Sequence, residues 1–291
     1  VAPGNAAPSR PAPSSGAEAP PADEPTTPAR FKPMMRAGAG VEVYWWSAKD
    51  IGSTFPVIPY GIFELSPSVL FDLHVPLSLA TNSTLSNTHT KAGVGLGNPT
   101  VGITYVSTEG RTSWHIGGRI GLPVAGLSDS EPWQGADALA AFSMALYDIH
   151  YWASKYVPIG MRLGVEHMAT PKLFLRAAIE PTLFVPIDSK RAQLAGSQKT
   201  LFLYQLRLEL EGRSDSGWGG GLGLQLVHVL SDGNAFGDKD NAQGAIEPFV
   251  SYDSTTTFAR IGLLLAMDSP LGPGFDQDKV AALRVNIGSH F

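Results

Sequence analysis

The sequence contains no cysteine and no long apolar run, and these two absences exclude several classes of protein. Without cysteine among its 291 residues, the chain can form no disulfide, no thiolate nucleophile and no cysteine-ligated metal site. No stretch of about 18 consecutive apolar residues occurs, so no segment is typical of a transmembrane helix. A chain of this kind can still cross a membrane as a β-barrel, whose strands need only about 10 residues of alternating character.

Positive charge is also scarce. The chain has 21 Lys and Arg against 26 Asp and Glu, which gives a net charge of −5 and no basic cluster. We therefore expect no nucleic-acid partner, because binding to phosphates depends on clustered positive charge. The G-x-S-x-G, H-E-x-x-H and P-loop signatures are missing too. We accordingly predict that the protein is not an enzyme and that it has no catalytic residue, metal or cofactor.

The last stretch of the chain shows a strand pattern most clearly. From Val280 to Phe291, apolar residues alternate with mostly polar ones, which is the period-2 pattern of a strand between two environments. The apolar side holds Leu283, Val285, Ile287 and Phe291. A closing strand that ends on Phe resembles the membrane-insertion signal of bacterial outer-membrane β-barrels. The alternative is an ordinary edge strand.

Eleven earlier segments show the same two-faced pattern. Short turns near 65, 109, 170, 214 and 254 alternate with longer polar loops, one of which we place at 80–93. A soluble β-sandwich would not need an apolar outward face along nearly every strand. The sequence therefore predicts an all-β fold over residues 37–291. Its form is a 12-stranded antiparallel transmembrane β-barrel in the bacterial outer membrane.

Residues 125–157 do not follow this alternation. Their apolar residues recur at spacings of three and four: Leu139, Phe142, Leu146, Ile149 and Ala153. This spacing favours a helix inside a long extracellular loop that caps or plugs one mouth of the barrel. A strand within the same segment is the alternative, so the sequence leaves helix or strand open over 136–153.

The faces opposite the apolar ones would line the lumen. The candidate lumen-lining residues are Asp72, His74, His115, Arg119, Arg162, Glu166, Arg176, Glu180, Arg207, Glu209, Glu247, Arg260, Arg284 and Asn286. Their acids and bases nearly balance, so we expect no strong ion filter. The residues could form a salt-bridge lattice, since buried charges must be paired, or a polar path for a small solute. Both interpretations can hold together.

Residues 1–36 differ in composition from the rest. Nine of the 23 prolines fall in residues 1–33. A segment of this composition cannot bury enough apolar surface to order itself, so we predict a disordered periplasmic arm. The arm could contact a periplasmic protein or the cell wall, or be no more than an unstructured leader. The start at Val1, without Met or an apolar stretch, is consistent with removal of a secretory signal peptide.

One glycine-rich stretch carries a resemblance to a known family. Gly95-Leu96-Gly97-Asn98-Pro99 begins a strand, and the return strand closes on Leu122-Pro123. With the terminal Phe, this pattern resembles the outer-membrane family named for the meta-pathway of phenol degradation, over residues 37–291. The resemblance implies a barrel that passes small, often hydrophobic or aromatic compounds, and it transfers no functional residue.

Two functions follow as hypotheses. The first is passage of small solutes, with outer-membrane lipid and lipopolysaccharide around the barrel and the barrel-assembly machinery as its partner during insertion. The second is a non-conducting structural or assembly subunit of an envelope complex, which would bind protein partners through its arm and loops.

Overall fold

The computed structural model describes residues 35–48, 52–83, 90–125, 131–188, 199–230, 241–267 and 281–291. All of them belong to one unit, Pro33–Phe291. The predicted arm lies outside the described residues except for Met35 and Arg36. Most residues of the long loops after β9, β11 and β13 lie outside them too.

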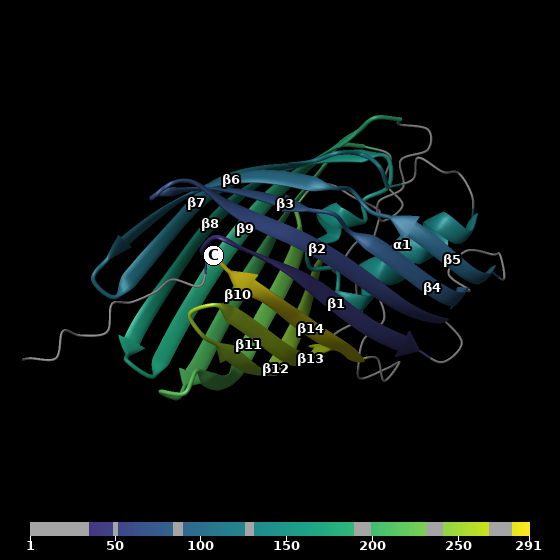
Figure 1. The fold of residues 1–291 in the computed structure, drawn as a ribbon. Coiled ribbons are helices and arrows are strands. Elements are labelled where there is room, and N and C mark those ends of the chain that lie inside the picture. The colour runs from purple at the N-terminus through teal and green to yellow at the C-terminus, as the bar shows by residue number, and fades with distance from the viewer. Residues whose placement is uncertain are drawn as a thin grey trace, which may run out of the picture. The chain divides into compact units, whose positions relative to one another are not determined.

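The described residues form one antiparallel sheet that closes on itself (Figure 1). Its strand segments are β1 (Gly38–Ala48), β2 (Gly52–Ser66), β3 (Val69–His74), β4 (Leu77–Ser83), β5 (Thr90–Leu96), β6 (Thr100–Glu109), β7 (Thr112–Gly121), β8 (Tyr156–Thr170), β9 (Leu173–Pro186), β10 (Leu201–Arg213), β11 (Trp218–Val229), β12 (Ala242–Asp253), β13 (Thr257–Ala266) and β14 (Ala281–His290). β2 pairs with both β3 and β4, which form one barrel strand with a short break. β5 and β6 form another, since they pair with β4 and β3. The barrel therefore has twelve strands, and the predicted fold is confirmed.

The last strand closes the barrel, as the sequence predicted. β14 pairs with β13 on one side and with β1 on the other, with Val41 opposite Ile287. Leu283, Ile287 and Phe291 are exposed on the outside, whereas Arg284 is buried inside. Because alternate residues of a strand point to opposite faces, a single alternating sequence supplies both the outer surface and the interior.

The predicted loop at 80–93 is wrong in part. β4 runs to Ser83 and β5 begins at Thr90, so strand residues occupy both ends of this interval, and 84–89 lie outside the described residues. The outward residues Leu79 and Val94 are apolar and exposed, but the inward ones are small or polar, such as Ser78 and Gly95. Because the inward side chains are small or polar, the sequence shows no clear alternation here, and a helix packs against this part of the wall.

That helix is α1 (Glu131–Ser143), and a short 3-10 turn, η1 (Ile149–Tyr151), follows it. The helix predicted in this segment is therefore confirmed, but it ends well before Ala153. Ala145, Leu146 and Asp148 have positive φ, a backbone conformation that cannot continue a right-handed helix. Among the described residues no helix is both long and apolar enough to cross a membrane.

Residues 131–155, called the plug from here on, pack against the inner wall of the barrel. α1 contacts β1, β2, β4 and β5. Leu139, Met144 and Trp152 belong to one buried apolar core with inward residues of the wall such as Trp46 and Phe184. The plug occupies the loop end of the barrel, where the long connections lie. The opposite end, with the short turns and the pairing of Phe291 N with Ala37 O, is called the turn end.

Candidate functional site

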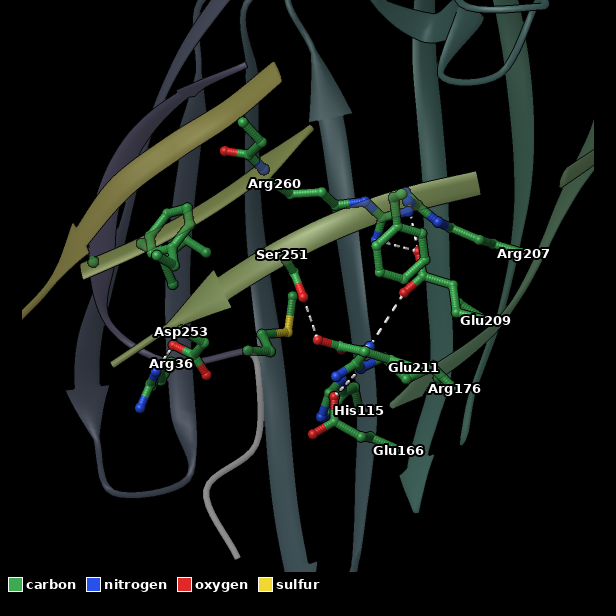
Figure 2. A pocket seen from close by; sticks show the side chains of 18 of the residues that line it. Arg36, His115, Glu166, Arg176, Arg207, Glu209, Glu211, Ser251, Asp253 and Arg260 are labelled. Carbon is green, nitrogen blue, oxygen red and sulfur yellow. Dashed lines mark hydrogen bonds and ion pairs between the residues drawn. The ribbon is translucent and has the colours of Figure 1, made fainter. Parts of the chain in front are cut away.

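A cavity of about 300 Å³ lies inside the barrel towards the turn end (Figure 2). Arg36 and Asp253 mark its outer rim, and Arg207 and Arg284 lie deeper. Side chains from β2, β7, β8, β9, β10, β12, β13 and β14 reach it, so it is a property of the closed barrel and not of one hairpin.

Arg176 on β9 organises one side of the cavity. Its Nε donates to Glu166 Oε2 at 2.6 Å, and its Nη1 donates to Glu211 Oε2 at 2.6 Å. Ser251 Oγ donates to the other oxygen of Glu211 at 2.6 Å. Glu166 is directly opposite Arg176 in the β8–β9 register, so the strand pairing itself positions this ion pair.

Glu247 on β12 is the centre of a second ion-pair group. Its Oε2 lies 3.0 Å from Arg284 Nη1, 3.1 Å from Arg260 Nη2 and 3.4 Å from Arg207 Nη2. Glu247 is fully buried. An isolated carboxylate in such a place would be strongly destabilising, so its arginine partners are a requirement of the fold. Arg260 also donates to Glu209 at 2.7 Å, which joins this group to the cavity wall.

A third group of polar residues lies beneath the plug. Arg119 Nη2 donates to Glu180 Oε2 at 2.9 Å, and Arg119 Nη1 lies 2.5 Å from His150 Nε2 of the plug. His74 pairs with Asp72 at 3.2 Å and contacts Tyr151 Oη at 2.9 Å. Two plug side chains, those of His150 and Tyr151, are thus bound to polar residues of the wall.

The glycine-rich stretch is where the wall holds the plug. Asn98, fully buried, donates from Nδ2 to the carbonyl oxygens of His150 at 3.0 Å and Ala153 at 2.9 Å. Its Oδ1 accepts from Ala125 N at 2.8 Å. A Cβ on Gly97 would lie 2.4 Å from the Tyr151 carbonyl oxygen, so only glycine permits this approach. The motif that carried the family resemblance therefore has a local structural role, which is to anchor the plug.

Burial in the plug shifts the pKa of two neighbouring groups in opposite directions. Burial raises the pKa of Asp148 to about 7 despite the nearby positive charge of Arg119. Burial, together with Arg119, holds the pKa of His150 well below its usual range. The two side chains lie close together, with His150 Nδ1 3.8 Å from Asp148 Oδ1.

The structure places all of the predicted lumen residues on the inner side of the barrel and separates them into groups. Nine line the cavity: His115, Arg162, Glu166, Arg176, Arg207, Glu209, Arg260, Arg284 and Asn286. Glu247 is bound to three of their arginines. Asp72, His74, Arg119 and Glu180 form the group beneath the plug. Their role in binding a solute stays a prediction.

Several interior charges were missed by sequence reasoning. Glu42 pairs with Arg284. It lies between Val41 and Val43, so the alternation of β1 could have predicted that its side chain points into the barrel. Arg213 pairs with Asp253 at 2.8 Å beside a turn, where alternation ends. Arg36 also pairs with Asp253, at 2.5 Å, and precedes the first strand. Nothing in the local sequence marks Arg36 as an interior residue.

The part of the chain that the structure describes holds no group of three or more His, Asp or Glu side chains arranged to bind a metal. Most of the carboxylates around the cavity lie beside arginines. The chemistry of the site is therefore that of paired charges.

Comparison with solved structures supports the barrel. The chain is similar to an outer membrane channel from Pseudomonas putida F1, with a TM-score of 0.58 and 11% sequence identity over 91% of this chain and 99% of that one. It is also similar to the NanC porin, with a TM-score of 0.54 and 9% identity over 87% of this chain and 98% of that one. No protein-family model and no curated protein sequence matches the chain. At these identities the likeness concerns the fold alone.

Proposed function

We propose that the protein is an outer-membrane barrel of a Gram-negative bacterium through which small solutes pass when the plug moves. The observation that carries the proposal is the division of the interior. A charged cavity lies towards the turn end, and at the loop end one separate chain segment packs against inward apolar side chains of the wall. A barrel that served only as a scaffold would need neither an internal cavity nor a separable plug.

The outer surface supports a membrane location. Large apolar side chains are exposed on strands all around the wall, among them Trp45, Ile103, Trp114 and Ile261, each more than half exposed. Contiguous apolar surface of this extent is unfavourable in water and is typical of the lipid-facing band of an outer-membrane barrel. We therefore propose phospholipid and lipopolysaccharide as its surroundings and the barrel-assembly machinery as its partner during insertion.

The lining of the cavity supports hydrophobic or aromatic solutes. The rings of Tyr60, Phe249, Tyr252 and Phe258 line it together with the charged groups. Aromatic faces bind flat apolar bodies well, and neighbouring charges orient them. The resemblance to the meta-pathway family points to the same solute class.

Liposome swelling tests the proposal. Purified full chain and a variant whose residues 130–154 are replaced by a short Gly-Ser linker are reconstituted into liposomes and mixed with small neutral solutes. We expect slow swelling with the full chain and fast swelling with the variant, because the plug fills the loop end. Heat-modifiable migration on a gel checks that each barrel is folded.

The tight burial of the plug favours one other function, a non-conducting structural subunit. Under that alternative, neither the full chain nor the folded plug-less variant would pass any solute. This result would overturn the transport proposal.

A further inference from the structure

The cavity at the turn end presents more positive than negative groups. Among the residues that the structure describes, seven arginines line it against four carboxylates. Two carboxylates that neutralise Arg284, Glu42 and Glu247, do not line the cavity, and Glu247 is fully buried. A solute in the cavity therefore meets a surface richer in guanidinium groups than the interior as a whole.

The strand register places two small residues in the middle of this surface. His115 is opposite Gly164, Gly164 is opposite Ala178, and Ala178 is opposite Arg207, across β7, β8, β9 and β10. All four line the cavity. Because Gly164 and Ala178 project little into the lumen, the wall is hollow between the imidazole and the guanidinium group. A Cβ on Gly164 would make only ordinary contacts, the nearest at 3.5 Å, so the barrel wall itself does not require glycine there.

Two more arginines flank this hollow. Arg162 is two residues from Gly164 on β8, and Arg176 is two residues from Ala178 on β9, so each shares the inward face of its small neighbour. With Arg207, they surround the small residues on three neighbouring strands.

Each of these three arginines has hydrogen-bonding capacity left over. The ion pair of Arg162 is with Glu180 at 3.6 Å, which is too long for a hydrogen bond. Arg176 Nη2 and Arg207 Nε are buried atoms of cavity-lining side chains, and neither has a hydrogen-bond partner among the residues that the structure describes. Figure 2 shows Arg176 and Arg207 together at the cavity beside Glu209. A planar guanidinium group with free N–H bonds matches the two oxygens of a carboxylate.

We propose that the cavity binds a small organic monocarboxylate with a ring-sized apolar body, its carboxylate held by Arg162, Arg176 and Arg207 over the hollow at Gly164 and Ala178. The inference rests on the proposed function and names the solute class of the same lumen. A monoanion fits better than a dianion, because glutamates already neutralise much of the arginine charge. The aromatic side of the lining takes the apolar body, and about 300 Å³ is at the lower end of the range for small-molecule sites.

Titration calorimetry on the full chain in detergent tests this assignment with three probes of one shape: benzoate, benzyl alcohol and benzylammonium. Protein-free micelles give the blank for each probe. We expect benzoate to bind at least about tenfold more tightly than the neutral alcohol, because charge-assisted hydrogen bonds add to ring burial. Benzylammonium should bind most weakly.

Two variants and one control locate the site. Arg162→Gln should weaken benzoate binding about tenfold and leave benzyl alcohol unaffected. The fold should persist, since Glu180 keeps its 2.9 Å bond to Arg119. Ala178→Leu should remove binding of benzoate by filling the hollow. Arg111→Gln makes the same exchange at an exposed turn and should match the parent chain.

Equal binding of the three probes, or the same benzoate affinity in Arg162→Gln and Arg111→Gln, would overturn the assignment. Swelling and calorimetry separate this proposal from the transport function. Benzoate binding without solute flux in the plug-less variant would keep the site and reject transport. Flux without benzoate binding would keep transport and reject the site.

Discussion

The two ends of the barrel interior have opposite chemistry. At the loop end, Trp46, Leu139 and Phe184, each at most 1% exposed, belong to an apolar core shared by plug and wall. At the turn end, the interior is rich in charged side chains, mostly arginines and glutamates, and they all belong to the wall or its immediate extension. One end is thus closed by a separate segment, whereas the charges of the other end are fixed in the sheet.

This difference separates closure from recognition. The plug is held by apolar contacts and by a few directional bonds, chiefly those of Asn98. On the proposed function, its movement would leave the ion pairs around the cavity intact. The ion pairs, in contrast, keep long side chains in defined positions across neighbouring strands. Variants at the two ends should therefore differ in which property they change, stability of the barrel or passage through it.

The largest effect is expected on the stability of the barrel, from a change in the charged interior at the turn end. Glu247→Gln leaves three arginines around a neutral side chain, and losing one partner of a buried ion pair costs about 3–5 kcal/mol. Urea unfolding followed by gel migration would measure the loss. Asp215→Asn is the matched control, because its pair with Lys172 at 2.9 Å is exposed and should contribute less than about 1 kcal/mol. Equal effects of the two variants would contradict the account of the charged interior.

Asn98→Ala should give the next largest effect, a weaker hold on the plug at the loop end of the barrel. It leaves two carbonyl oxygens and one amide of the plug connection without their bonds, at about 1–3 kcal/mol each where they stay buried. We expect faster liposome swelling with little change in barrel unfolding. Ser214→Ala, at an exposed turn of the opposite end, serves as the control. Unchanged swelling would show that Asn98 does not hold the plug.

Gly97→Ala should also speed liposome swelling, but less than Asn98→Ala. The added methyl group would meet the Tyr151 carbonyl oxygen at 2.4 Å, and such overpacking typically costs about 1–3 kcal/mol. At Gly212 the nearest atom to an added Cβ is 3.9 Å away, so Gly212→Ala should be neutral. Swelling rates of the two variants would check the difference, and equal rates would contradict the close approach at Gly97.

The smallest effect concerns pH and the plug. Because the folded pKa of Asp148 is raised from 3.8 to about 7, the folded plug keeps a proton that the unfolded chain releases, so plug stability falls as pH rises through this window. His150 has a lowered folded pKa, so it contributes the opposite slope below its unfolded value near 6.5. The two contributions offset each other in the parent chain.

His150→Gln should remove that compensation. We then expect swelling to increase from pH 5 to pH 7.5 in the variant and to stay nearly level in the parent chain. Adding Asp148→Asn should flatten the profile again. A sloping profile that survives in the double variant would assign the pH dependence to other groups.

Much of the fold could be predicted because a membrane-type barrel imposes two environments on every strand. Alternation in β14 and the strands before it follows directly from lipid outside and polar groups inside. The prediction failed around β4 and β5, where the inward neighbours are plug atoms. Ser78 and Gly95 leave room for α1, whose Asp137 packs against both. In the sequence, small or polar inward residues beside Thr and Asn are typical of a loop, so these parts of the strands were not predicted.

The sequence predicted many of the charged residues that face the interior, but it did not predict which of them form ion pairs with each other. Alternation places Arg176 and Glu166 on inward faces, yet only the strand register puts them opposite each other. The helical spacing indicated a helix in this segment, but of its five residues only Leu139 and Phe142 lie in α1. The irregular chain after Ser143, with three residues at positive φ before η1, has no sequence signal. Arg36 joins the cavity rim only through tertiary structure.

A tether between plug and wall tests the central claim most directly. Ser78 Oγ on β4 lies 3.2 Å from Asp137 Oδ1 on α1, and the chain has no other cysteine that could interfere with Ser78→Cys/Asp137→Cys. Ser53→Cys/Thr81→Cys is the control. Ser53 Oγ on β2 and Thr81 Oγ1 on β4 lie 2.6 Å apart at an exposed position, so a disulfide there would join two strands of the wall and not the plug.

Liposome swelling is then measured for both pairs before and after reduction. We predict that solute flux through the plug-tethered protein stops on oxidation and returns on reduction, whereas flux through the wall pair does not change on reduction. Equal flux through the oxidised and reduced plug tether would contradict the claim that solutes pass only when the plug moves.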